Sequence, residues 1–159
     1  MQATGNLPDA NHVFEIVGRL FGDETLVKQA SSPFKVDGET IYATYVGDDG
    51  TTRALLVCDI AFAVRAGASL TMIPPGTAEE SIQTKDIPDN LFDNLGEILN
   101  ICVNLFMDAF TDPLRLGATI RDSSELDDNA KAVLESSQRA DFDIDIPRYG
   151  EGKMTLLIS

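Results

Sequence analysis

The chain has 159 residues, of which 43% are apolar and 24% are charged, as in an ordinary globular protein. These proportions exclude a disordered, fibrous or membrane-embedded chain. Acidic residues outnumber basic ones by 26 to 12, and the net charge of −14 argues against nucleic acid or an anionic membrane as a partner. We expect one domain over residues 1–159, with a flexible segment at 1–8.

Neither a targeting signal nor a zinc-site pattern is found in the sequence. Residues 1–11 lack the basic start and the apolar core of a signal peptide, so we expect a cytoplasmic protein. Cys58 and Cys102 form no C-x-x-C pair, and His12 is the only histidine, so the spacing of a structural zinc site is missing. We expect two reduced, buried thiols, although one disulfide would also fit the sequence.

The first 60 residues predict a helix followed by strands. Apolar residues recur at helical spacing from Asp9 until Gly22 ends the helix. His12, on this helix, is interpreted as a surface histidine, because the strands that follow contradict a helical phosphotransfer bundle. Strands are predicted at residues 25–30, 40–46 and 53–58, the last two joined by a tight turn.

A second helix is predicted after Asp59, which is a suitable N-cap residue. Its small residues, among them Ala66 and Gly67, would let it lie close to a neighbouring element. Pro74 is expected to end it, and a polar connection is expected from Gly76 to Asp86.

The last third of the chain predicts mainly strands, at residues 114–120, 141–146 and 153–158, with a short helix at 125–136. The aspartates at 141, 143 and 145 are spaced like the start of a calcium loop, but the required glycine and glutamate are missing. We interpret 141–146 as a strand with one buried face, whose charged face protects an exposed edge. Because strands and helices are grouped rather than alternating, the fold class is α+β.

The segment 91–108 predicts a long helix with a single polar stripe. At about 100° per residue, the stripe is roughly 80° wide and every other side is apolar, so only the stripe would face water. The simplest interpretation is the solvated edge of an amphipathic helix. However, the stripe contains no Lys, Arg or Gln, and it includes two asparagines, which are poor helix formers. Its members are Asp93, Glu97, Asn100, Asn104 and Asp108.

The run Asp93-Asn-Leu-Gly-Glu97-Ile-Leu-Asn100 resembles the motif of the CheC, CheX and FliY chemotaxis phosphatases. In that family Asp or Ser is followed by Glu after three residues and by Asn after two more. The chain is most similar to CheX, since Gly18 stands on the first helix where a second motif would place its amide. The resemblance implies an antiparallel sheet with long helices packed on it, and we expect a homodimer paired through strand contacts.

The resemblance also implies a reaction, namely hydrolysis of the aspartyl phosphate on a CheY-like response-regulator receiver domain. Asn100 would orient the attacking water, and Glu97 would dock on the receiver's lysine. Asp93 and Asn104 would be accessory residues. The receiver would supply Mg²⁺, and no cofactor is implied for this chain itself.

The chain departs from the family pattern at two positions. Asn104 stands where the family has a small residue, and Ser123 stands where it has a proline. These departures favour an alternative, a non-catalytic binding module that recognises a receiver or another signalling or flagellar partner through the same helix.

Overall fold

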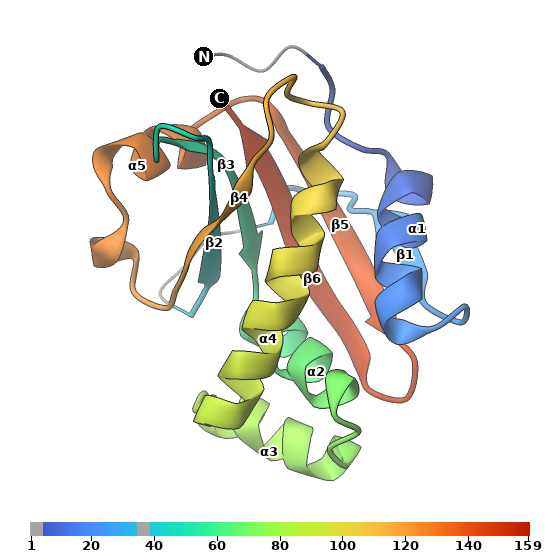
Figure 1. Cartoon of the computed structure of the whole chain (residues 1–159). Coiled ribbons are helices and arrows are strands. Elements are labelled where there is room, and N and C mark those ends of the chain that lie inside the picture. Colours follow the sequence, from blue (N-terminus) through green and yellow to red (C-terminus); the bar gives the residue numbers. More distant parts are fainter. Residues whose placement is uncertain (1–4, 35–38) are drawn as a thin grey trace.

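Six strands form one antiparallel sheet in the computed structural model, which describes residues 5–34 and 39–159 (Figure 1). The strands are β1 (Leu26–Gln29), β2 (Ile41–Val46), β3 (Thr52–Cys58), β4 (Arg115–Ile120), β5 (Arg139–Ile146) and β6 (Gly150–Ile158). They are hydrogen-bonded in the order β1-β5-β6-β3-β2-β4, and every neighbouring pair is antiparallel. The predicted α+β class with an antiparallel sheet is confirmed.

Helices cover both faces of this sheet. They are α1 (Ala10–Phe21), α2 (Ile60–Leu70), α3 (Pro75–Thr84), α4 (Asp89–Ile101) and α5 (Asp128–Leu134), with short 3₁₀ helices η1 (Cys102–Phe106) and η2 (Ser123–Glu125). Asp59 caps α2 as predicted, and Asp9, from which the first helix was expected to start, caps α1. Each carboxylate accepts a hydrogen bond from a backbone N–H in the first turn. Figure 1 shows α4 running across one face, with α5 beside the β2–β3 end of the sheet.

Alternation along the strands builds two hydrophobic cores. Successive side chains of a strand point to opposite faces, so Ala43 and Tyr45 of β2 join the larger core under α1, α2 and α4. Tyr42 of the same strand joins a smaller core with Val133 of α5. The central strands are therefore buried on both sides, and the larger core supports α4.

The polar connection expected at 76–86 is wrong, because this segment is the helix α3. Pro75 is found in its first turn, where a missing backbone N–H costs nothing, and Lys85 ends it in the left-handed conformation with φ 58°. Only Ala78 and Ser81 of this helix are buried. So narrow an apolar stripe left no periodic signal in the sequence.

The long helix expected over 91–108 is correct only as far as Ile101, after which the chain continues as the 3₁₀ helix η1. Asn104 lies in η1, and its Nδ2 donates a hydrogen bond to the carbonyl oxygen of Ile101 at 2.9 Å. A side chain that bonds the preceding turn in this way competes with the regular backbone ladder.

The strand predicted at 141–146 exists, but it does not lie at an edge of the sheet. It pairs with β1 on one side and β6 on the other, so the edges are β1 and β4. Its expected buried face is confirmed for Phe142, Ile144 and Ile146. Two of the charges opposite that face are paired within the chain, Asp141 with Arg139 and Asp143 with Lys153.

The helix expected at 125–136 is shorter than predicted, since α5 covers only Asp128–Leu134 with Asp127 as its N-cap. The segment expected to be flexible, 1–8, lies partly outside the described residues, and within it Gly5 N donates to the carbonyl oxygen of Ala109 at 3.1 Å. No helix among residues 5–34 and 39–159 combines the length and apolar character that crossing a bilayer requires. The homodimer stays a prediction.

Candidate functional site

The inner face of α4 fixes the helix on the body of the protein. Leu91, Leu95, Ile98 and Leu99 are almost completely buried in the larger core. The hydroxyl of the buried Tyr45, on β2, donates a hydrogen bond to the carbonyl oxygen of Leu99 at 2.7 Å. These contacts set both the rotation of α4 about its axis and its distance from the sheet.

The motif residues lie on the opposite, outer face of α4. Asp93, Glu97 and Asn100 are all exposed, as the spacing of four and three residues predicts for one side of a helix. Within the part of the chain that the structure describes, none of the three side chains makes a hydrogen bond or an ion pair. Two carboxylates and one carboxamide thus face solvent together on a rigid helix.

Gly96, immediately before Glu97, is a further feature of this face that the motif did not identify. It lies in the middle of α4, where a glycine costs about 1 kcal/mol relative to alanine. A Cβ atom built on Gly96 would meet no other heavy atom within 4 Å. Packing within the described chain therefore does not require a glycine here, and its helical cost alone could have drawn attention to it.

Asn104 and Asp108, the last two members of the predicted stripe, do not continue the motif face as an α-helix would. Asn104 is held against its own backbone by the bond to Ile101, and it is half-buried. Asp108 lies beyond η1, where its Oδ2 is 3.6 Å from Nδ1 of His12 on α1. The structure therefore brings Asp93, Glu97 and Asn100 together on α4, while Asn104 lies folded against η1 and Asp108 lies toward α1.

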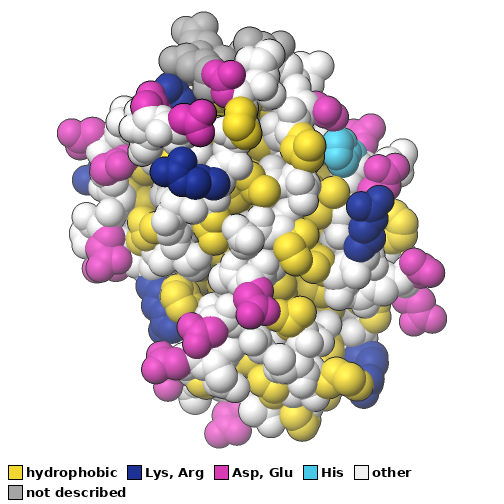
Figure 2. All heavy atoms as spheres, in the orientation of Figure 1, with side chains coloured by type: hydrophobic (Ala, Val, Ile, Leu, Met, Phe, Trp, Pro, Cys, Tyr) yellow, Lys and Arg dark blue, Asp and Glu magenta, His cyan; other side chains and the backbone are white. Residues whose placement is uncertain are grey.

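Apolar side chains are exposed next to Asn100 and after η1, contrary to the expectation that only polar residues of segment 91–108 face water. Ile101 is 41% exposed and Met107 is 66% exposed. In Figure 2, acidic side chains lie over the lower half of α4, and hydrophobic atoms reach the surface over its upper half. The face around Asn100 thus combines negative charge with accessible apolar surface.

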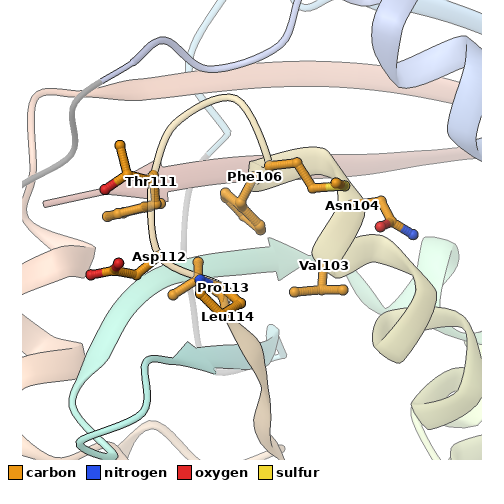
Figure 3. A pocket seen from close by; sticks show the side chains of 9 residues that line it. Val103, Asn104, Phe106, Thr111, Asp112, Pro113 and Leu114 are labelled. Atoms are coloured by element: carbon orange, nitrogen blue, oxygen red, sulfur yellow. The ribbon is translucent and has the colours of Figure 1, made fainter.

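A cavity of about 330 Å³ opens where η1 meets the loop that leads to β4. Figure 3 shows Asn104 at one side of this cavity, Thr111 and Asp112 at the other, and Phe106 between them. The motif residues Asp93, Glu97 and Asn100 do not line it. Sites for small molecules are normally concave, whereas this motif projects from the outer surface of a helix, which favours a macromolecular partner.

One cation lies against the same helix. The guanidinium carbon of Arg121 is 4.0 Å from the ring centroid of Phe92, and its Nη2 donates to the carbonyl oxygen of Ile87 at 3.2 Å. Stacking on an aromatic face and a bond to backbone hold this exposed cation at the side of α4.

The other reactive side chains lie away from the motif or are buried. Cys58 and Cys102 are free thiols with no exposed surface, as expected. Burial raises the pKa of Cys102 to about 12 and raises the pKa of Cys58 as well. Among residues 5–34 and 39–159, no three His, Cys, Asp or Glu side chains are grouped as metal ligands would be.

Comparison with known proteins gives matches among solved structures. A chain of the FliM–SpeE complex from H. pylori matches with a TM-score of 0.64 and 10% identity, covering 94% of this chain and 80% of that chain. FliY from Thermotoga maritima matches with a TM-score of 0.59 and 12% identity, covering 91% and 81%. The CheX–CheY–BeF3–Mg complex from Borrelia burgdorferi matches at 0.48 with 11% identity, covering 94% and 97%, a likeness too weak to support an argument. No protein-family model and no curated protein matches the sequence.

These similarities establish the fold. The chain has the α+β architecture of the FliM middle domain and of FliY, with helices packed on an antiparallel sheet. At identities of 10 to 12%, these structural similarities show the fold alone.

Proposed function

We propose that this protein hydrolyses the aspartyl phosphate of a CheY-like response-regulator receiver domain. The observation that carries the proposal is the joint exposure of Asp93, Glu97 and Asn100 on one face of α4, with no side-chain partner among the described residues. The motif resembles that of the CheC, CheX and FliY phosphatases, and the fold is shared with FliY. A projecting helix can enter a receiver's active site, whereas a pocket could not.

Asn100 is the residue that we assign to the chemical step. Phosphoryl transfer proceeds through a loose transition state, so catalysis depends on positioning and charge neutralisation more than on a strong base. The carboxamide of Asn100 can hold a water molecule in line with the bond to be broken. That water attacks phosphorus, the bond from phosphorus to the aspartyl oxygen breaks with its electron pair going to the carboxylate, and the water's proton passes to the released phosphate.

Glu97 is the residue that we assign to docking. A glutamate one turn before Asn100 can pair with the lysine of a receiver's active site and so fix the position of α4 over the acyl phosphate. A charged hydrogen bond of this kind becomes stronger when the interface excludes water. Asp93, a turn earlier, is an accessory residue at the rim of the contact.

Asn104 was expected to be accessory and, because of its size, an obstacle to docking. The bond from its Nδ2 to the carbonyl oxygen of Ile101 folds the side chain back onto the helix backbone, so that it does not project into solvent. This arrangement supports a docking face that is open despite the departure from the family pattern.

The receiver would supply Mg²⁺ and the lysine, and this chain would supply a carboxylate and a carboxamide. Such a division of labour needs no nucleophile on this chain. It agrees with an outer face of α4 that carries no serine, cysteine or histidine.

The test measures phosphate release from receivers of the source genome that have been phosphorylated with a small-molecule phosphodonor. We expect the wild-type protein to accelerate the release and Asn100→Ala to abolish the acceleration while keeping its thermal unfolding midpoint within a few degrees. Equal rates with wild type, with Asn100→Ala and without added protein for every receiver would disprove the proposal.

A second candidate is a binding module without catalysis, as Ser123 and Asn104 suggested. It is favoured by the exposed Ile101 next to Asn100, by the exposed Met107 after η1, and by the match to a chain from a FliM complex. This candidate predicts that the protein binds a receiver or another protein partner while the rate of phosphate release stays unchanged.

A further inference from the structure

The absence of a side chain at Gly96 has a geometric consequence for Asn100. In an α-helix every Cα–Cβ bond tilts toward the N-terminus, so a side chain covers the turn that precedes it. The turn before Asn100 contains Gly96, four residues earlier on the same side of α4. Asn100 therefore leans over bare backbone on the flank where Gly96 lies, while Glu97, three residues earlier, borders its other flank.

The other motif residues differ in this respect. Glu97 leans over Asp93, so its preceding turn is covered by another side chain. Beside Asn100, the helix surface is open on the flank where Gly96 lies, and on the C-terminal side the Asn104 side chain is folded back against the carbonyl oxygen of Ile101. A partner can therefore approach the carboxamide of Asn100 closely from the Gly96 flank.

The other helical glycines among the described residues are Gly18, Gly67 and Gly76. Gly18 of α1 is buried, and a Cβ there would lie 3.4 Å from the ring of Phe14. Gly67 of α2 is required by its neighbour, because a Cβ there would lie 2.7 Å from the carbonyl oxygen of Leu91. Gly76 also has open space around it, but it lies in the first turn of α3. The first turn of a helix is less regular than its middle, since its backbone N–H groups have no partners within the helix. Of these four glycines, only Gly96 is both mid-helical and free of any heavy atom within 4 Å of a built Cβ.

We infer that Gly96 is a positioning residue. Its missing side chain leaves a notch in the surface of α4, where the rim of a receiver's phosphorylation site can contact the helix backbone. This contact brings the acyl phosphate to Asn100. This inference rests on the proposed function and deepens it. The notch selects a partner whose anionic group is recessed, because only a partner that closes on the helix backbone can place a recessed group against the short Asn100 side chain. A side chain at position 96 would lie beside the carboxamide and keep the two surfaces apart.

The test uses two substitutions at this position, Gly96→Ala and Gly96→Leu, with Gly76→Leu as a matched control on α3 at the end farther from α4. Binding is measured with a receiver activated by beryllium fluoride, a mimic of the acyl phosphate, and turnover is measured with the phosphorylated receiver. We expect Gly96→Leu to weaken binding at least about tenfold, which corresponds to ~1.4 kcal/mol. We expect Gly76→Leu to bind like the wild type.

Gly96→Ala separates docking from folding. Alanine is the better helix former, so the unfolding midpoint should rise by about 2–4 °C while binding weakens. KM should increase several-fold and kcat should stay close to that of the wild type, because Asn100 is unchanged. A purely structural role for Gly96 would move stability and binding in the same direction.

The outcomes distinguish this inference from the proposed function. A wild-type protein that accelerates phosphate release, together with a Gly96→Leu variant that binds and turns over equally well, overturns the inference alone. A wild-type protein that neither binds nor dephosphorylates any receiver overturns both.

Discussion

Asn94 of α4 donates a hydrogen bond from its Nδ2 to the carbonyl oxygen of Gly67 on α2, at 2.9 Å, and a second one to Thr71 Oγ1 at the same distance. The two helices can approach so closely because Gly67 has no side chain facing Leu91. The small-residue helix predicted from the sequence is therefore the support that locates the motif helix.

Replacing Gly67 by alanine should destabilise the protein. The new Cβ would lie 2.7 Å from the backbone oxygen of Leu91, which cannot move without moving α4. Overpacking of this kind costs about 1–3 kcal/mol, measurable as a lower urea midpoint. Gly76→Ala, where a Cβ meets nothing within 4 Å, is the control and should show no such loss.

Asp141 should contribute to stability in a pH-dependent way. Partial burial raises the pKa of its carboxyl, but hydrogen bonds from Arg139, Thr155 and the Phe34 N–H outweigh burial and lower the pKa below its usual value. A lowered folded-state pKa means that the stabilisation is complete above the unfolded pKa of about 3.9 and is lost as the pH falls through the folded value.

The corresponding experiment compares wild type with Asp141→Asn by urea unfolding at pH 7 and at several values below pH 4. We expect the variant to be less stable by about 1–3 kcal/mol at pH 7, because hydrogen bonds to a charged acceptor are weakened. The difference should shrink as the pH is lowered. A difference that is constant with pH would show that the charge of Asp141 is not responsible.

The sequence was most informative where local signals and packing agree. Asp59 was recognisable as an N-cap, Asp9 marked the start of the first helix, and the alternation in 141–146 identified the buried face of that strand. It was least informative about pairing between distant segments. Nothing in the composition of 141–146 shows that the short strand β1 pairs with its outer edge. The hydrogen bonds of this pairing join backbone N–H and C=O groups, which nearly every residue carries.

For the candidate site, helical spacing was sufficient to place Asp93, Glu97 and Asn100 on one exposed face. It was not sufficient for Asn104, since the change from α-helix to 3₁₀ helix after Ile101 alters the angle between successive residues. The polar helix α3 was missed because it buries only two of its side chains, so tertiary contact and not periodicity defines it.

The two cysteines should be unreactive while the protein is folded. Cys58 and Cys102 have no exposed surface, and burial raises the pKa of both, that of Cys102 to about 12, so little thiolate forms at pH 8. We expect no reaction with a thiol reagent such as dithionitrobenzoate in buffer and two thiols per chain in denaturant. Rapid labelling of the native protein would show that one of these sites opens to solvent.

Ionic strength should separate the general charge of the protein from the specific contact of Glu97. With a net charge of −14, this protein repels a receiver whose active site is rich in carboxylates, so added salt should lower the KM for the phosphorylated receiver. Glu97→Gln and Asp93→Asn each remove one negative charge from the outer face of α4 without changing its shape, and they relieve the repulsion equally.

If Glu97 pairs with the receiver's lysine, Glu97→Gln should nevertheless raise KM by about tenfold at every salt concentration. This increase corresponds to the loss of ~1.4 kcal/mol, which one charged hydrogen bond can supply. Asp93→Asn should lower KM slightly at low salt and have no effect at high salt. The same KM for both variants across the salt series would contradict the docking role of Glu97, because charge alone would then account for the interaction.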